Sequence, residues 1–260
     1  MDFSQRIGGR LMISRPVTWL GVAVAAVLLA ATPAHPQDAG NGFLFKAPAG
    51  AVTLRGGFDR ANAGSDLFSF ATEQLTLKRR DFSAITFAAD VDYRVTPRLD
   101  ASFGVSVSRS TMPSEFRHWL DNNNRSIEQT TEFIRVPLTT SVKMYLAEPG
   151  RSVGHFAWIP SRYAPYVGAG GGVLWYRFEQ SGDFIDFATT RVFPDDFRSQ
   201  GWTPTLQAFV GTDVSLNPRL AVTTEARYQW ARSRLDRDFS GFNRIDLSGF
   251  ALTAGISIRY

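Results

Sequence analysis

The sequence predicts an all-β fold, an eight-stranded antiparallel up-and-down transmembrane β-barrel. Three observations lead to this prediction. Eight segments of the 260-residue chain alternate between apolar residues and small or polar ones, short turns alternate with long polar connections, and an export-like segment lies near the N-terminus. A chain that is 44% hydrophobic and 20% charged has the composition of a folded protein.

The N-terminal region predicts a secretory signal. Basic residues precede an apolar run and small residues follow it: Arg6, Arg10 and Arg15, then Trp19 to Ala31, then a cleavage motif that ends at Ala34. The run is about 13 residues long, whereas a spanning helix needs about 20, so a signal is favoured over a membrane anchor. We therefore expect a signal peptide at 1–34 that starts at Met1 or Met12, a periplasmic N-terminal segment at 35–50, and an outer-membrane β-barrel domain at 51–260.

The eight alternating segments predict eight strands. In chain order they cover residues 52–59, 85–95, 99–108, 134–146, 165–179, 206–216, 220–230 and 250–260. In the second segment, for example, Ile85 and Phe87 alternate with Asp90 and Asp92 on the other face. Period two defines the two faces of each strand but does not say which one points outward.

Two segments depart from simple alternation. Pro137 lacks the N–H that a ladder interior needs, so we expect a bulge or a locally unpaired position there. The segment 165–179 carries glycine and aromatic residues on both faces, so its facing is ambiguous.

The connections come in two kinds. Residues 96–98 and 216–219 are tight turns within the similar sequences RVTPRLD and SLNPRLA. Long polar connections are expected at 60–82, 109–130, 179–203 and 232–244. The connection 147–164 is an exception, because it is long but lies at the end of the short turns.

Two physical arguments place the apolar face on the outside. The interior of an eight-stranded barrel is just wide enough to be filled by side chains, and eight stripes of large apolar residues would overfill it. The polar face consists mainly of Gly, Ala, Ser and Thr, whereas a solvated exterior would favour Lys, Glu and Gln. The apolar face is therefore expected to contact lipid.

The sequence resembles the small outer-membrane β-barrels of Gram-negative bacteria, similar to OmpA, OmpX and OmpW. The resemblance covers roughly residues 42–260 and depends on the signal, the eight amphipathic segments, the motif PYVGAGGG at 165–172 and the terminal Tyr260. It implies a porin-like cell-envelope protein in the outer membrane, monomeric, in contact with outer-membrane lipid and lipopolysaccharide. It also implies insertion by the barrel-assembly machinery, which reads the terminal aromatic residue.

The ionic residues of the polar face are expected to share the narrow lumen. They are Arg55, Asp90, Asp92, Arg94, Asp100, Arg135, Lys143, Asp213, Glu225, Arg227 and Arg259. Unpaired charges there would be costly, so both signs should form a hydrogen-bonded network. We expect this network to be a structural plug, with a path for small solutes or ions as the alternative.

Aromatic residues near the strand ends are expected at the membrane interfaces, with ordinary core packing as the alternative. They are Tyr93, Tyr145, Trp175, Tyr176, Tyr228, Trp230 and Tyr260. Lys78, Arg79 and Arg80 could pair with phosphates of the outer leaflet or form a solvated basic run.

The sequence favours a structural or surface-interaction role in which a rigid barrel displays four extracellular loops. The alternative is a narrow channel or carrier for small or apolar solutes. A lipid A modifying enzyme is disfavoured, because His35, His118 and His155 do not lie on a strand beside a serine at useful spacing. No metal site or cofactor is expected, and the scattered basic residues do not predict nucleic-acid binding.

Overall fold

The computed structural model describes residues 42–120, 124–154, 157–186 and 191–260, so the predicted signal peptide and residues 35–41 of the predicted N-terminal segment lie outside the described residues. Eight long strands form the main sheet: β1 (Gly50–Ala61), β2 (Ala84–Thr96), β3 (Leu99–Leu120), β4 (Ser126–Tyr145), β7 (Tyr163–Asp186), β8 (Arg191–Ser215), β9 (Leu220–Ser233) and β11 (Gly249–Arg259). Each corresponds to one alternating segment of the sequence.

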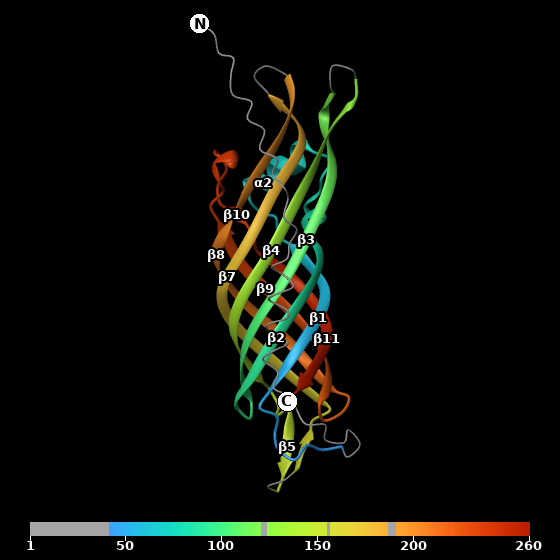
Figure 1. The fold of residues 1–260 in the computed structure, drawn as a ribbon, viewed down its shortest axis with the longest axis vertical. Coiled ribbons are helices and arrows are strands. Elements are labelled where there is room, and N and C mark those ends of the chain that lie inside the picture. The colour runs from blue at the N-terminus through green and yellow to red at the C-terminus, as the bar shows by residue number, and fades with distance from the viewer. Residues whose placement is uncertain (1–41, 121–123, 155–156, 187–190) are drawn as a thin grey trace, which may run out of the picture. The chain divides into compact units, whose positions relative to one another are not determined.

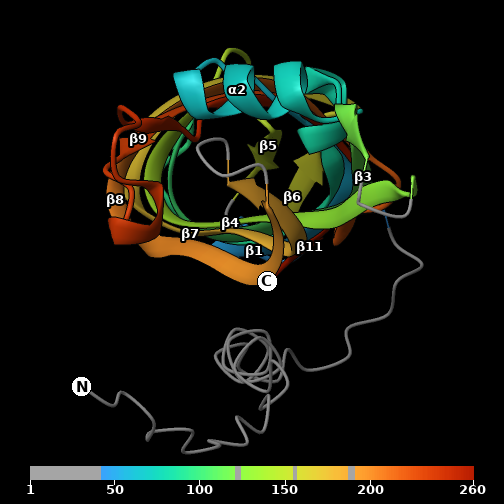
Figure 2. The same ribbon diagram turned by 90° about the horizontal axis from the view of Figure 1, so that it is seen from above.

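These strands close into a ring (Figures 1 and 2). Each pairs antiparallel with the next in the order β1-β2-β3-β4-β7-β8-β9-β11, and β11 pairs with β1. At the seam, the backbone N–H of Tyr260 donates to the carbonyl of Gly50 at 3.1 Å, and the N–H of Ala49 donates to the carbonyl of Tyr260 at 2.7 Å. The predicted fold class, an eight-stranded antiparallel barrel, is confirmed.

The two ends of the barrel differ in their connections. We call the end with the connections 62–83, 121–125, 187–190 and 234–248 the loop end, and the opposite end, with 97–98, 146–162 and 216–219, the turn end. The loop end carries α2 (Asp66–Gln74), the 3-10 helices η1 (Arg79–Phe82) and η2 (Arg237–Phe239), and the short strand β10 (Ile245–Asp246), which pairs with β9. Among the described residues, no helix is long and apolar enough to cross a bilayer.

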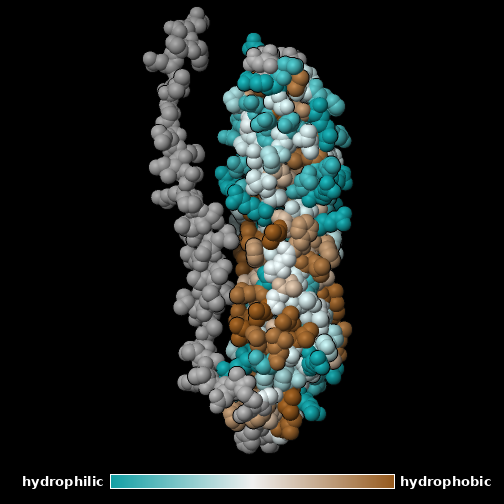
Figure 3. Space-filling view, turned by 90° about the vertical axis from the view of Figure 1, so that its right-hand side faces the viewer, coloured by the Kyte–Doolittle hydropathy of each residue, from teal (hydrophilic) through white to brown (hydrophobic). Residues whose placement is uncertain are grey.

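Exposed apolar side chains of the alternating segments form a belt on the outside of the barrel, and one face of it is visible as the mainly hydrophobic band in Figure 3. The belt includes Leu54, Phe58, Ile85, Phe87, Phe103, Val142, Met144, Leu206, Val210, Leu252, Ile256 and Ile258, each at least 49% exposed except Met144 at 45%. Their neighbours along each strand, such as Thr53, Ser141 and Thr223, are buried inside. The apolar face therefore points outward, and the polar face fills the interior.

Pro137 leaves a local gap in the ladder without a bulge. The register between β3 and β4 runs from Val105 opposite Leu138 to Ser108 opposite Arg135, and the two intervening pairs are not formed. On its other side Pro137 lies opposite Leu174 of β7 in unbroken register. The missing N–H is thus accommodated as an unpaired position, one of the two predicted outcomes.

The expected long loops at 109–130 and 179–203 are wrong as loops, because most of these residues are strand. β3 continues to Leu120 and β4 already begins at Ser126, while β7 and β8 contain 24 and 25 residues. In contrast, β1 and β11 contain only 12 and 11 residues. The barrel wall is therefore high along β3, β4, β7 and β8 and low elsewhere. Apolar and polar residues still alternate in these segments, as in a strand. Their composition is polar, as in a loop, and the loop prediction followed the composition.

The loop-end half of the interior is apolar. Phe133 of β4 and Leu174, Tyr176 and Phe178 of β7 are buried there, in contact with Phe68 of α2 or with its neighbours in the same cluster. α2 lies along one side of the rim at the loop end (Figure 2), and its residues Leu67 and Phe68 belong to this cluster. One neighbour of Phe133 along its strand is Glu132 and those of Phe178 are Arg177 and Glu179, so the facing pattern of the belt is inverted near these residues, whereas Leu174 lies between Val173 and Trp175. This inversion is expected where a wall leaves the bilayer and meets water.

The long connection at the turn end contains a small hairpin of β5 (Gly150–Val153) and β6 (Ala157–Pro160). Leu44 pairs with Trp158 by two backbone hydrogen bonds of 2.9 and 2.7 Å, so the chain before β1 lies against this hairpin. The Trp158 side chain is buried, and the guanidinium carbon of Arg259 lies 5.6 Å from its ring centre. The exceptional length of this connection is therefore explained by a folded hairpin that packs against the end of the lumen.

Candidate functional site: the charged lumen

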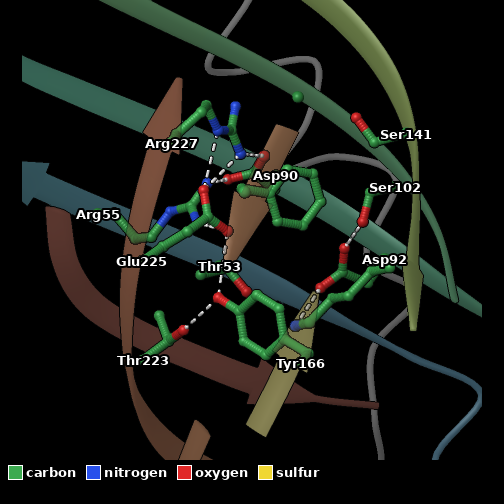
Figure 4. Close-up of a pocket in the computed structure, with 13 residues that line it drawn as sticks. Thr53, Arg55, Asp90, Asp92, Ser102, Ser141, Tyr166, Thr223, Glu225 and Arg227 are labelled. Carbon is green, nitrogen blue, oxygen red and sulfur yellow. Dashed lines mark hydrogen bonds and ion pairs between the residues drawn. The ribbon is translucent and has the colours of Figure 1, made fainter. Parts of the chain in front are cut away.

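Four charged side chains form a closed group across the lumen (Figure 4). Arg55 of β1 contacts Asp90 of β2 at 2.5 Å and also contacts Glu225 of β9. Arg227 of β9 contacts Glu225 at 2.8 Å and Asp90 at 3.5 Å. Two guanidinium groups and two carboxylates thus balance each other. The pairing satisfies buried charges that would otherwise be costly in this narrow interior.

A second group lies toward the turn end. Lys143 of β4 contacts Asp92 of β2 at 3.5 Å and Asp213 of β8 at 3.3 Å. The Tyr145 hydroxyl donates to Asp213 at 2.8 Å, and the Ser102 hydroxyl donates to Asp92. One cation is shared by two carboxylates, and each carboxylate also accepts a hydrogen bond from a hydroxyl, while Oδ1 of Asp213 is buried without a hydrogen-bond partner among the described residues.

Tyr166 of β7 connects this region to the first group. Its hydroxyl donates to Glu225 at 3.1 Å and lies 3.2 Å from the Thr223 hydroxyl, and its ring centre is 4.0 Å from the Lys143 ammonium. The side chain is almost completely buried. Sequence reasoning missed Tyr166, because the facing of the segment 165–179 was ambiguous.

The remaining predicted ionic residues also face inward. Arg94 pairs with Asp100, and Arg259 donates to the Ser215 hydroxyl at 2.9 Å. Arg135 contacts Asp59 at 2.8 Å and donates to the carbonyl of Leu247 at 3.1 Å.

All eleven residues of the sequence-derived ionic set are thus buried or half-buried inside the barrel. Asp59 was not in that set, although it shares the inward face of its segment with Arg55. Alternation alone was therefore sufficient to find it.

Large inward side chains lie against glycines of the neighbouring strand. A Cβ atom at Gly211 would overlap the ring of Tyr166, and one at Gly168 would overlap the ring of Phe209. The register places each glycine directly opposite the residue that it accommodates. The inward positions of the glycine-rich segment are therefore needed for close packing within the barrel.

The charged groups leave little free space. The cavity among Arg55, Asp92, Lys143, Tyr166 and their neighbours has a volume of about 10 Å³, room for about one water molecule. Toward the loop end the lumen is filled by the apolar cluster beneath α2, and at the turn end Trp158 lies against Arg259.

Most of the predicted interface aromatics face outward near the limits of the belt. Trp230 is 49% exposed at the loop end and Tyr93 is 60% exposed at the turn end. Trp175 lies opposite the exposed Trp202, and Tyr228 packs on Trp230 with ring centres 4.7 Å apart.

Tyr260, the last of the outward aromatics, is 37% exposed at the turn end beside β1. Sequence reasoning did not include two exposed aromatics, Trp202 and Tyr163, that lie near the same two limits.

Tyr145 and Tyr176 correct the predicted interface set, because both point into the barrel. Tyr145 is bonded to Asp213, and the Tyr176 hydroxyl donates to the carbonyl of Arg234 at 2.8 Å. Tyr145 occupies an inward position of its strand, so its facing was readable from the alternation. Tyr176 lies in the ambiguous segment, above the belt, where a large inward residue fills the apolar cluster.

Of the three histidines considered for catalysis, the structure describes one. His118 is exposed near the end of β3, whereas His35 and His155 lie outside the described residues. In the part of the chain that the structure describes, no group of three His, Asp or Glu side chains is arranged to hold a metal ion. Lys78 and Arg80 are exposed, and Arg79 donates to the Ser69 hydroxyl at 3.2 Å.

An apolar belt around a charged, filled interior is the arrangement of a barrel that spans a bilayer, because the closed ladder pairs the backbone while lipid contacts the belt. The chain is a membrane-spanning β-barrel. No family model and no curated protein matches its sequence. The similar solved structures are small outer-membrane β-barrel proteins.

Three of them illustrate the similarity. Neisserial surface protein A is 12% identical and superposes with a TM-score of 0.44 over 85% of this chain and 98% of its own. Ail, the attachment invasion locus protein of Yersinia pestis, is 12% identical with a TM-score of 0.39 over 80% and 99%. AlkL is 17% identical with a TM-score of 0.34 over 88% and 96%. Because these scores lie below 0.5, we base the assignment on the ladder and the belt of this chain.

Proposed function

We propose that this barrel has a structural and surface-interaction role: a closed, non-conducting cylinder that displays a folded cap outside the cell. The observation that carries the proposal is the Arg55, Asp90, Glu225 and Arg227 group, which spans the lumen and leaves space for about one water molecule beside it. An ion path needs continuous hydrated space, and this group replaces that space with paired charges.

The cap supports the same proposal. α2 packs on the apolar cluster through Leu67 and Phe68, and the rings of Phe68 and Phe82 are 4.7 Å apart. Asp66 at the start of α2 accepts hydrogen bonds of 2.9 and 2.8 Å from the backbone and side chain of Asn243. The connections 62–83 and 234–248 are thus joined into one surface with a defined shape. A preformed surface loses less conformational entropy on binding than flexible loops do.

Conductance measurements test the non-conducting cylinder. The purified protein is inserted into planar bilayers, and heat-modifiable mobility in detergent gels verifies that the same sample is folded. We expect no resolved openings above the lipid baseline. Reproducible, solute-dependent openings from folded protein would overturn the proposal in favour of the channel or carrier.

Single-cysteine labelling tests which end is outside. The chain has no cysteine, so Glu73→Cys at the loop end and Arg151→Cys at the turn end each introduce one thiol. With a membrane-impermeant maleimide we expect Glu73→Cys to react on intact cells and Arg151→Cys to react only after the outer membrane is permeabilised. The reverse pattern would place the cap in the periplasm and contradict the proposed role.

A further inference from the structure

The turn end carries an unusual excess of positive charge. Among the described residues, the charged side chains beyond the end of the belt on this side are Lys46, Arg98, Glu148, Arg151, Arg162 and Arg219. Glu148 is the one carboxylate in this set, and it contacts Arg98 at 3.5 Å. Lys46, Arg98, Arg151 and Arg162 are all exposed to solvent.

The basic residues at the loop end have a different environment. Glu132 contacts both Arg109 and Arg177, and Arg198 lies 3.9 Å from Glu179. Carboxylates are interspersed with arginines throughout this end, so the positive charge is locally compensated. The excess at the turn end is therefore a property of one surface rather than of the whole protein.

Exposed apolar and aromatic side chains accompany the turn-end cations. Phe45 and Val153 are 54% and 50% exposed although both lie outside the barrel ladder. The Arg162 guanidinium lies 5.6 Å from the ring centre of Tyr163, which is 59% exposed at the limit of the belt. Basic side chains next to exposed rings are typical of protein surfaces that lie at a membrane interface.

The fold holds these residues in place. β5 and β6 form a hairpin, Leu44 pairs with Trp158, and the Trp158 ring occupies the space where Gly150 lacks a side chain. The hairpin and residues 42–49 therefore form one folded unit at the end of the barrel. A preformed array of cations loses less entropy on binding an anionic surface than a flexible tail.

We propose that this turn-end surface, defined by Lys46, Arg98, Arg151 and Arg162 with Phe45 and Val153, binds anionic phospholipid headgroups of the leaflet on the turn side. The inference depends on the proposed orientation, in which that leaflet faces the periplasm. Charge complementarity requires an anionic partner. The exposed apolar side chains favour a lipid surface over a hydrophilic anionic polymer, which would leave Phe45 and Val153 in water.

Lipid retention tests the inference. The full-length mature protein is reconstituted in nanodiscs of phosphatidylcholine with one fifth phosphatidylglycerol, and the lipids that stay bound are counted by native mass spectrometry. The variant is Arg98→Gln with Arg162→Gln, and the matched control at the loop end is Arg234→Gln with Arg237→Gln, two exposed residues. A basic side chain near an anionic membrane is worth about fivefold in affinity, so we expect roughly 25-fold weaker phosphatidylglycerol retention in the turn-end variant. Little change is expected in the control.

Three results would overturn the inference. Equal retention of the two phospholipids by the wild type excludes a headgroup preference, and equal losses in both variants exclude the turn end as its location. Co-sedimentation with purified peptidoglycan that is lost in the turn-end variant, without loss of phosphatidylglycerol, assigns the surface to the wall polymer. Heat-modifiable mobility of each sample verifies an intact barrel, and cysteine labelling reports the orientation separately. Failure of the lipid preference is thus distinguishable from failure of the proposed function.

Discussion

Arg55 and Glu225 are in contact across the lumen although their strands, β1 and β9, are not hydrogen-bonded neighbours. β11 lies between these strands, and Gly255 occupies the position opposite Arg55. The missing side chain at Gly255 leaves the guanidinium free to reach over β11. Barrel closure therefore makes an ion pair between residues that are 170 positions apart in the sequence.

Glu225→Gln tests the importance of charge balance in this group. The substitution leaves Arg55 and Arg227 with Asp90 alone, so we expect the free energy of unfolding to fall by about 3 to 5 kcal/mol. Urea unfolding of the protein in lipid vesicles, followed by tryptophan fluorescence, measures the change. The control is Glu148→Gln, whose side chain is 51% exposed, with an expected effect of about 0.5 kcal/mol or less. Equal unfolding midpoints for both variants would contradict a stabilising network.

Tyr145→Phe tests the inward position of a residue that the sequence suggested as an interface aromatic. The variant removes the hydroxyl that donates to Asp213 at 2.8 Å. Because hydrogen bonds to charged groups are the stronger ones, we expect a loss of about 1.5 to 3 kcal/mol in unfolding free energy. Tyr93→Phe on the exposed surface provides the comparison and should be nearly neutral. A larger effect at Tyr93 than at Tyr145 would favour the interface interpretation.

Gly211→Ala tests the close packing of the lumen. The new methyl group would overlap the ring of Tyr166 and the backbone carbonyl of Thr224, so we expect destabilisation by about 1 to 3 kcal/mol. Gly56→Ala is the matched control, because the closest atom to its added Cβ is a ring carbon of Phe87 at 3.6 Å, an ordinary contact. The same urea experiment compares the two variants, and indistinguishable stabilities would mean that the interior is loosely packed.

Leu252→Lys tests whether the belt contacts lipid. Leu252 is 58% exposed, and a lysine on the lipid face of a barrel costs about 2 to 4 kcal/mol near the bilayer midplane. On a water-exposed surface the same change would cost about 0.5 kcal/mol or less. Unfolding in vesicles distinguishes these values, and Glu73→Lys on α2 serves as the solvent-exposed control. A small effect at Leu252 would contradict the assigned orientation of the two faces.

The contact between Asp66 and Asn243 predicts a pH dependence of the cap. The backbone hydrogen bond from Asn243 holds the pKa of Asp66 below its usual value, despite a smaller opposing effect of burial. A lowered folded-state pKa stabilises the cap above the usual carboxyl pKa, and this stabilisation is lost as the pH falls through the lowered value. Limited proteolysis within 62–83 at acidic and neutral pH should show the change. Asp66→Asn should abolish the difference if Asp66 causes it.

Alternation with period two, together with the short turns, was sufficient to predict the strands and their number, and the sizes of the side chains on the two faces indicated which face points outward. Side-chain parity is a local property, so Leu252 and Ile256 could be assigned to one face and Thr253 and Ser257 to the other from spacing alone. The same parity identified the inward charged residues. It did not reveal their partners, because pairing across a lumen depends on strand tilt and register as well as on facing.

The tertiary structure decided where each residue lies along the barrel axis, in the belt or in the part beyond it. Phe133 and Tyr176 point inward because their strands have left the bilayer and enclose an apolar cluster beneath α2, whereas equally large residues of the belt point outward to lipid. It also decided that β5 and β6 pair as a hairpin with Trp158 against Arg259. Apolar and polar residues alternate along the strands both in the belt and beneath α2. Only closure of the ring and the position of each segment relative to water and lipid decide whether the apolar residues face outward or inward.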